Sequence, residues 1–314
     1  MMKMWKLAAM STVAIGMLAT SFTTAYAGTA KTASVSGKTI GFADSTLTNP
    51  YFVALQKGVD SEAKKYGLKV INDNANNDDS TQLNQVEDLI QQHVSVILLN
   101  PVDSQSLSSA VKAANSAGIP VITLDRSVNS GKVATFIASD SVLAGKMAAQ
   151  ELIKALHGKG TVVELQGILG ESAEIDREQG FDKEIATAPG IKVVAKQSAN
   201  FDRATAMNVM QNILQAHPTI NGVFAQNDEM ALGALEAIQQ AGKKNIKVVG
   251  IDGEQEAIND VNKGTMYADI AQQPTEEGVL GIDYAVKLLK GQKIPSKVNS
   301  PLHLVTKGSK FKGF

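Results

Sequence analysis

The sequence predicts an α/β protein with two similar, doubly wound (Rossmann-like) lobes, each built on a parallel sheet. Short β-branched runs with almost no alternation of apolar and polar residues indicate strands that are buried on both faces, as in a parallel sheet covered by helices. These runs alternate with helical patterns, which is typical of βα units. The alternation restarts halfway along the chain, and two sets of about five units predict two lobes of the same kind.

The first set of elements begins at Lys38 and ends with two strands that have no helix between them. Its first helix is amphipathic, and its strands are short runs of Val, Ile and Leu. In chain order we expect strand 39–43, helix 51–66, strand 68–71, helix 80–92, strand 94–99, helix 104–117, strand 120–124 and strand 133–138.

The second set repeats this rhythm and ends with a long helix. In chain order we expect helix 142–157, strand 161–165, helix 174–188, strand 192–195, helix 203–216, strand 222–225, helix 229–241, strand 246–251, helix 254–262, strand 266–271 and helix 276–289.

The first residues have the three parts of a secretory signal peptide. Lys3 and Lys6 give a positive start, residues 7–19 are apolar, and residues 25–27 (Ala-Tyr-Ala) form an A-x-A cleavage site. The apolar stretch is shorter than the roughly 20 residues that a membrane-spanning helix needs. We therefore expect cleavage after Ala27, and removing 27 residues from 314 leaves 287. That length exceeds the usual size of a single core, so two domains are expected.

The composition excludes several classes of function. With 30 Lys and Arg against 31 Asp and Glu, the net charge of −1 offers no basic field for nucleic acid or an anionic membrane surface. The chain contains no cysteine, which excludes disulfides, thiol catalysis and a lipid-modified N-terminal cysteine. An exported protein without a lipid tether is expected to be free in a periplasm.

Five of the predicted strands end abruptly at polar residues. In open α/β sheets, ligands bind in the crevice beyond the carboxyl ends of the strands. Because these polar ends come from both halves of the chain, we expect a ligand cleft between the lobes. Planar amide, carboxylate and guanidinium groups suit a small, neutral, hydroxyl-rich ligand. The residues are Asn100, Asp125, Arg126, Gln226, Asn227, Asp252 and Gln272.

Asp125 and Arg126 form the strongest candidate pair. A carboxylate beside a guanidinium can accept from one hydroxyl and donate to another through charge-assisted hydrogen bonds. The alternative is that Asp125 caps the next turn and Arg126 lies in solvent. The polar residues at equivalent strand ends weaken that alternative.

Aromatic residues are expected to cover the apolar faces of a ring-shaped ligand. Tyr51 and Phe52 follow Asn49 at the first strand-to-helix junction, where the rings can stack on C–H groups and Asn49 can bond a hydroxyl. Phe201 can close the opposite face. For each ring, a place in the core of the protein is an alternative that the spacing leaves open.

The sequence gives little support for catalysis or metal binding. The four histidines are dispersed and lack the spacing of a metal site. The stretch 72–79 is rich in Asn and Asp but lacks the central glycine and closing glutamate of a calcium loop, so we expect a solvated turn. The acidic run over 171–178 could supply a glycosidase-like carboxylate pair, but favourable placement at a helix start explains it more simply. We therefore predict binding without catalysis, cofactor or metal.

Five motifs are long and specific: Ser45 to Phe52 (STLTNPYF), Pro120 to Arg126 (PVITLDR), Ile137 to Asp140 (IASD), Phe201 to Arg203 (FDR) and Val223 to Leu235 (VFAQNDEMALGAL). With them, the chain resembles the periplasmic sugar-binding proteins of the ribose-binding type, over residues 38–307. This resemblance implies the type I periplasmic binding fold, with two lobes joined by a three-strand hinge and crossovers near 138–140, 272–273 and 300–302. It implies an N-terminal lobe of residues 38–139 plus 273–301 and a C-terminal lobe of residues 140–272 plus 302–314.

The resemblance also implies a site for β-D-ribopyranose. Phe52 and Phe201 match the stacking aromatics of the family. Arg177 is implied by the resemblance alone, because it lies on a predicted helix and not at a strand end. Tyr51 stands where the family commonly has Phe, and its hydroxyl needs a partner if it is buried, since an unpaired group costs about 1–3 kcal/mol. The implied polar contacts are Asn49, Asn100, Asp125, Arg126, Arg177, Asn227, Asp252 and Gln272.

The function that the resemblance implies is the capture of ribose in the periplasm and its delivery to an ABC-type importer by lobe closure. The expected partners of this monomer are the monosaccharide and the membrane permease, and a chemotaxis receptor stays open. The ligand also stays open between ribose, another pyranose such as allose, fructose, and a sugar-like signalling molecule. A related sugar-responsive repressor would need a DNA-binding helix-turn-helix where the export signal stands. An exported sugar-processing enzyme is the remaining alternative.

Overall fold

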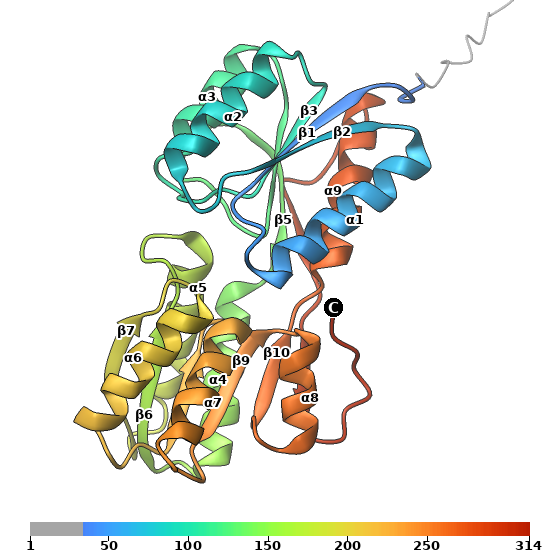
Figure 1. The fold of residues 1–314 in the computed structure, drawn as a ribbon. Coiled ribbons are helices and arrows are strands. Elements are labelled where there is room, and N and C mark those ends of the chain that lie inside the picture. Colours follow the sequence, from blue (N-terminus) through green and yellow to red (C-terminus); the bar gives the residue numbers. More distant parts are fainter. Residues whose placement is uncertain (1–33) are drawn as a thin grey trace, which may run out of the picture. The chain divides into compact units, whose positions relative to one another are not determined.

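The computed structural model describes residues 34–314, so the predicted signal peptide at 1–27 lies outside the described residues. Within residues 34–314 the chain forms two six-stranded sheets with helices on both faces of each (Figure 1). From edge to edge, the first sheet contains β11 (Lys297–Ser300), β5 (Val133–Ser139), β4 (Val121–Leu124), β3 (Val96–Leu99), β1 (Thr39–Asp44) and β2 (Lys69–Asn74). The second contains β12 (His303–Thr306), β10 (Ala268–Ala271), β9 (Lys247–Asp252), β8 (Gly222–Ala225), β6 (Gly160–Gln166) and β7 (Ile191–Ser198). The predicted doubly wound α/β fold is confirmed.

The first sheet is covered by α1 (Pro50–Tyr66) and α9 (Pro274–Leu289) on one face and by α2 (Asp79–Gln91) and α3 (Ser108–Ser116) on the other (Figure 1). Successive residues of its strands point to opposite faces. In β3, Val96 and Leu98 pack into the cluster beneath α1 and α9, and the residues between and after them pack beneath α2 and α3. Burial on both faces is the reason that the strand runs show no alternation.

The second sheet is covered by α4 (Ser141–Ala155) and α5 (Ser172–Ile185) on one face. On the other face lie α6 (Arg203–Ala216), α7 (Asp228–Gln240) and α8 (Gln255–Lys263). Phe224 of β8 packs beneath α4 and α5, where its ring stacks on Phe181 with 4.5 Å between the ring centres. Its neighbours Val223 and Ala225 pack beneath α6 and α7.

Two edge strands, β11 and β12, were not predicted. Both are short and partly exposed, and their sequences (KVNS and HLVT) lack a continuous apolar run. Strand β12 runs antiparallel to β10, whereas the other strand pairs of the two sheets are parallel, as predicted. The third helix, α3, begins at Ser108 and not at 104, because the Asp103 side chain accepts hydrogen bonds from the backbone N–H groups of Gln105 and Ser106 and holds a turn there.

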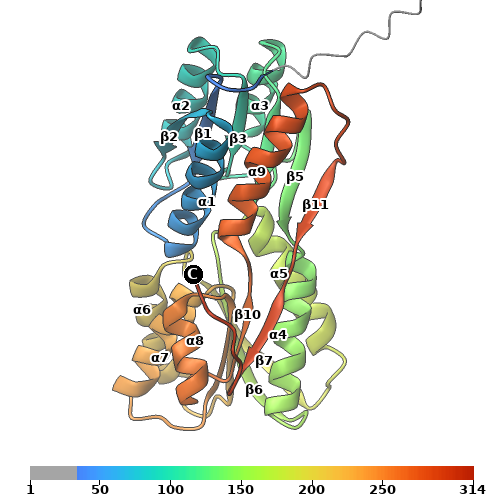
Figure 2. The same ribbon diagram turned by 90° about the vertical axis from the view of Figure 1, so that its right-hand side faces the viewer.

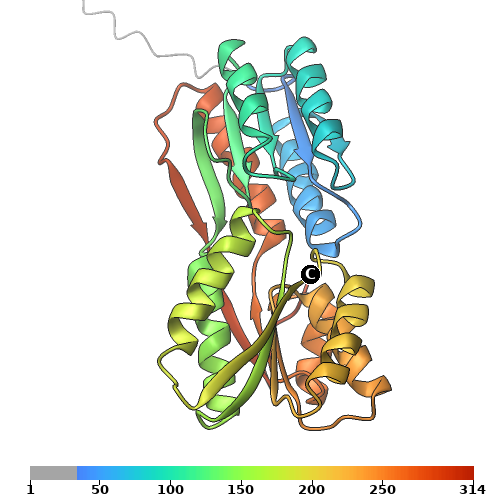
Figure 3. The same cartoon turned by 90° about the vertical axis from the view of Figure 1, so that its left-hand side faces the viewer.

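Three segments connect the two sheets: one between β5 and α4, one between β10 and α9, and one between β11 and β12. Figure 2 and Figure 3 show β5 and β11 side by side as they run toward these connections. The crossovers expected near 138–140, 272–273 and 300–302 fall in the three segments, in agreement with the predicted three-strand hinge. In the described part of the chain, none of the helices has the length and apolar character needed to cross a bilayer.

Candidate functional site

Loops that follow strands of both sheets meet between the sheets and enclose a small cavity. The strand-end residue Gln226 is fully buried and bonds Gly167 and Glu164. Nine of the other eleven predicted site residues line the cavity, together with Glu171 and Ala173. The cavity volume is about 20 Å³, which is little more than the space of one water molecule. The side chains around it must therefore move apart before a ring-shaped ligand can enter. The nine residues are Asn49, Tyr51, Phe52, Asp125, Arg126, Arg177, Phe201, Asn227 and Asp252.

Asn49 fixes the start of α1 and with it the two aromatic residues. Its side chain accepts a hydrogen bond from the Tyr51 N–H at 2.8 Å, which is the usual geometry of a helix N-cap. Tyr51 and Phe52 are only 2% and 3% exposed, and both pack into the core of the first sheet. The two rings therefore belong to the core of the protein, which was one expectation, and also form one wall of the cavity, where they could contact a ligand, which was the other.

Arg126 lines the cavity and is only 3% exposed, so the alternative that it lies in solvent is wrong. Its Nε is 3.7 Å from Asp125 Oδ2 and 3.4 Å from Glu171 Oε1. Its guanidinium carbon lies 4.9 Å from the centre of the Phe52 ring and 5.6 Å from that of Phe201. In this conformation the guanidinium occupies the space between the two rings that were expected to stack on a ligand.

Arg177 links three strand ends of the second sheet. Its Nη2 donates to Gln272 Oε1 at 2.7 Å, its Nη1 donates to the carbonyl of Gln226, and Nη1 lies 3.8 Å from Asp252 Oδ1. The helix that carries it, α5, packs very closely on α4. A Cβ atom added at Gly145 of α4 would collide with the carbonyl oxygen of Arg177, so the glycine allows this placement.

Phe201 and Asn227 form the opposite wall. The Asn227 side chain caps α7 by accepting from the Met230 N–H at 2.9 Å, and its Nδ2 donates to the Phe201 carbonyl at 3.4 Å. The Phe201 backbone has a φ of 56°, and its ring lies directly over Gly167. A Cβ at Gly167 would overlap this ring, so that glycine leaves room for it.

Two predicted residues, Asn100 and Gln272, lie behind the cavity wall. Asn100 Nδ2 donates to the Leu124 carbonyl at 3.0 Å, one residue before Asp125. Gln272 bonds Arg177 through its Oε1, and its Nε2 donates to the Tyr51 hydroxyl at 3.3 Å. Gln272 therefore contacts two residues that line the cavity, whereas Asn100 holds the strand end that precedes Asp125.

Sequence reasoning missed Glu171 and Glu277. Glu171 caps α5 by accepting from the Ala173 and Glu174 N–H groups, as expected for an acidic residue at a helix start, and it also reaches across to Arg126. The acidic run over 171–178 indicated the position of Glu171 at a helix start but not its contact with Arg126. Glu277 of α9 accepts a hydrogen bond from the Tyr51 hydroxyl at 3.1 Å. The hydroxyl that distinguishes Tyr51 thus has partners.

Burial dominates the electrostatics of the site. It raises the pKa of Asp125, although the charges of Arg126 and Arg177 oppose the shift. It raises the pKa of Asp252 well above its ordinary value, again against Arg177. Burial and the nearby Asp125 raise the pKa of Glu277 to about 8. The two arginines face nearby carboxyl groups, Arg126 beside Asp125 and Glu171 and Arg177 beside Asp252, so positive and negative groups offset each other. Such a polar site suits an uncharged, hydroxyl-rich ligand.

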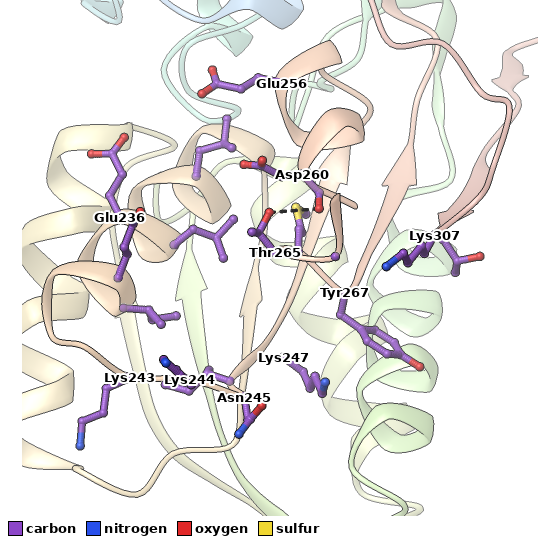
Figure 4. Close-up of a pocket in the computed structure, with 18 of the residues that line it drawn as sticks. Glu236, Lys243, Lys244, Asn245, Lys247, Glu256, Asp260, Thr265, Tyr267 and Lys307 are labelled. Carbon is purple, nitrogen blue, oxygen red and sulfur yellow. Dashed lines mark hydrogen bonds between the residues drawn. The ribbon is translucent and has the colours of Figure 1, made fainter. Parts of the chain in front are cut away.

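An adjoining cavity of about 50 Å³ shares four of the predicted residues, Asn49, Phe52, Arg126 and Phe201, with the cavity between the sheets. A larger groove of about 990 Å³ lies beside α7, β9 and α8 (Figure 4). It is lined by lysines, among them Lys243, Lys244 and Lys307, and in residues 34–314 none of the eleven predicted residues lines it. Within the same residues, no group of three or more His, Cys, Asp or Glu side chains is arranged to hold a metal ion. The candidate site is therefore the cavity between the sheets.

Comparison with known proteins gives matches over most of the chain. Residues 40–293 match a family described as a periplasmic binding protein domain. The ribose import binding protein of Bacillus subtilis (strain 168) is 50% identical over 268 residues, or 85% of this chain and 87% of that protein. The ribose import binding protein of Escherichia coli (strain K12) is 46% identical over 269 residues, or 86% and 90%.

A solved structure shares the fold over most of its length. It is an ABC transporter periplasmic solute binding protein from Actinobacillus succinogenes 130z with bound D-allose. It is 35% identical in sequence and has a TM-score of 0.82, and the match covers 86% of this chain and 98% of that one.

Proposed function

The chain belongs to the periplasmic binding protein family, and from that premise we propose that it captures D-ribose, as a pyranose, and delivers it to an ABC-type sugar importer. The family is one of binding proteins for transport and not of enzymes. One observation carries the choice of a sugar: carboxyl, guanidinium and amide groups from both sheets converge between Phe52 and Phe201. The names of the two ribose-binding relatives support ribose in particular.

We assign the ligand contacts to the eleven predicted residues. The carboxyl groups of Asp125 and Asp252 accept from sugar hydroxyls, and the guanidinium groups of Arg126 and Arg177 donate to them. Phe52 and Phe201 stack on the two faces of the ring once Arg126 has withdrawn to its edge, and Tyr51 lies beside them. The remaining contacts are the amide groups of Asn49, Asn100, Asn227 and Gln272.

Binding proceeds by closure of two lobes. The proposed lobes are residues 38–139 plus 273–301 and residues 140–272 plus 302–314, since the strands of each sheet fall within one of them. Contacts between Arg126 and Glu171, and from the Ser127 N–H to Ser172 Oγ at 3.0 Å, already join the lobes. A sugar that bonds both sides shifts the population toward the closed form, which the permease then recognises.

The strength of binding needed for this role is within reach of the site. A micromolar dissociation constant corresponds to about 8 kcal/mol. Charge-assisted hydrogen bonds contribute roughly 1.5–3 kcal/mol each, and four of the assigned contacts are charged or acidic groups: Asp125, Arg126, Arg177 and Asp252. The sum of these contributions can exceed the free energy that a micromolar dissociation constant requires, and the excess offsets the cost of ordering the ligand and the side chains.

Location and partners follow from the same role. Family membership implies a periplasmic protein, and we propose that residues 1–27 direct its secretion and are then removed. The proposed role needs only a monomer, with the membrane permease as its partner.

A second candidate ligand is D-allose, because the solved structure described above contains it. Allose carries one more hydroxymethyl group than ribopyranose. We expect the extra hydroxymethyl group to approach the Tyr51 hydroxyl at the edge of the cavity. Glu277 and Gln272 hold this hydroxyl in place. A rigid hydroxyl at this edge leaves less room for the larger sugar.

Calorimetry tests the proposal. Protein that has been unfolded and refolded to remove endogenous sugar is titrated with D-ribose and, for comparison, with allose, fructose, xylose and galactose. We expect one-to-one binding of ribose with a preference of at least about a hundredfold. Binding of another sugar in its place would contradict ribose, and absence of binding to all five would contradict the role.

A further inference from the structure

We propose that Phe314 is a positioning residue that bridges the two lobes and stabilises the closed form of the sugar site. The inference rests on the proposed function, since it concerns the closure that follows sugar binding. It concerns residues 307–314, which lie beyond the last strand and outside the predicted site.

The backbone of Phe314 is anchored to the second lobe, directly behind the sugar site. Its N–H donates to the Gly253 carbonyl and its C=O accepts from the Gln255 N–H, both at 3.3 Å. This loop follows Asp252, one of the predicted contacts. The three ribbon views agree that the C-terminal residue lies between the two sheets, beside the start of α1 (Figures 1, 2 and 3).

Packing holds the whole segment against the second lobe. A Cβ at Gly313 would lie 2.5 Å from the backbone nitrogen of Gln255, so the chain runs in close contact with this loop. Phe311 packs against the core of the second lobe, and its ring centre is 5.4 Å from that of His303 in β12. Phe314 is therefore expected to travel with the second lobe when the lobes separate.

The Phe314 side chain, in contrast, packs on the first lobe. Its ring meets Tyr51 edge-to-face, with 5.8 Å between the centres and 88° between the planes. It joins the hydrophobic cluster of α1 and α9 in the first lobe. Opening of the cleft must break this contact, whereas closing restores it, so the contact favours the closed form.

The bridge also reaches the ligand contacts through Tyr51. The Tyr51 hydroxyl is held by Glu277 and Gln272, and Gln272 bonds Arg177. The Tyr51 ring is thus restrained by Phe314 and also by Phe52, which meets it edge-to-face with 5.3 Å between the ring centres. Loss of the Phe314 ring is expected to loosen the closed site without removing any group that touches the sugar.

The first experiment measures sugar release by stopped-flow in three variants. Phe314→Ala should raise the dissociation rate and the Kd for D-ribose about two- to twelvefold, the range for an aromatic pair. The association rate should stay unchanged. Phe314→Tyr should retain wild-type behaviour, and Lys312→Ala, an exposed position in the same segment, is the matched control. A wild-type dissociation rate in Phe314→Ala, or a rise matched by Lys312→Ala, would overturn the proposal.

The second experiment needs no sugar and separates this inference from the proposed function. Because the chain has no cysteine, spin labels at Lys57→Cys on α1 and Asn212→Cys on α6 report the distance between the lobes alone. In the ligand-free protein, Phe314→Ala should shift the distribution of label distances toward longer values. An unchanged distribution would overturn the bridge. Failure of the unaltered protein to bind ribose would contradict the proposed function and leave this readout intact.

Discussion

Replacement of Arg126 by alanine removes a positive charge from the wall of the cavity. In the closed form, Glu171 and Asp125 lie 3.4 and 3.7 Å from its guanidinium, and all three side chains are at most 6% exposed. Removing one partner of a buried ion pair costs about 3–5 kcal/mol, because the remaining charge is left without compensation. When the cleft opens, water reaches both carboxylates, so this cost falls on the closed form and not on the fold.

The expected result is a protein that folds normally but binds ribose between about a hundred- and several-thousandfold more weakly. A micromolar ligand would then bind in the millimolar range, beyond detection by calorimetry. Arg203→Ala is the matched control, because this partly exposed arginine also pairs with two carboxylates, those of Glu229 and Glu256, but does not line the cavity. Such pairs contribute at most about 1 kcal/mol, or fivefold. A Kd for Arg126→Ala within tenfold of the wild-type value would refute the reasoning.

Three further variants probe the surroundings of the site. Tyr51→Phe leaves Glu277 and Gln272 without their shared hydroxyl and should lower the free energy of unfolding in urea by about 1–3 kcal/mol; an unchanged midpoint would contradict this role. Gly145→Ala should push α5 away from α4 at a cost of about 1–3 kcal/mol and, by moving Arg177, weaken ribose binding about tenfold; wild-type affinity by calorimetry would refute that coupling. Because the pKa of Glu277 is raised from 4.5 to about 8, its neutral form is the stable one in the folded protein. The stability that Glu277 contributes should thus be fully present below pH 4.5 and be lost as the pH rises through about 8, by at most about 1.4 kcal/mol per pH unit. Glu277→Gln should flatten this decline, as measured by thermal unfolding at a series of pH values. An equal slope in the variant would exclude Glu277 as the source of the decline.

The sequence predicts the sheets well because burial on both faces leaves a clear pattern. Strands such as β3 and β8 are uninterrupted apolar runs, and α6 begins and ends where expected. Edge strands lack this pattern: β12 pairs on one side only, and its exposed His303 and Leu304 carry no periodic signal. The start of α3 was predicted too early for a local reason, because the side chain of Asp103 holds a competing turn.

The site is predictable where chemistry coincides with a strand end. Asp125, Asn227 and Asp252 follow from that rule alone, because parallel strands present their carboxyl ends at one edge. Contacts made across the cleft are not predictable in this way. Glu171 and Phe314 are far from their partners in sequence, and their roles depend on how the two lobes meet.

A crystal structure of the protein with D-ribose would locate the sugar site directly. We expect one sugar between Phe52 and Phe201, bonded to Asp125 and Arg126 on one side and to Arg177 and Asp252 on the other, with both lobes in contact with it. A sugar bound to one lobe only, or in the lysine-lined groove of Figure 4, would contradict the proposed site.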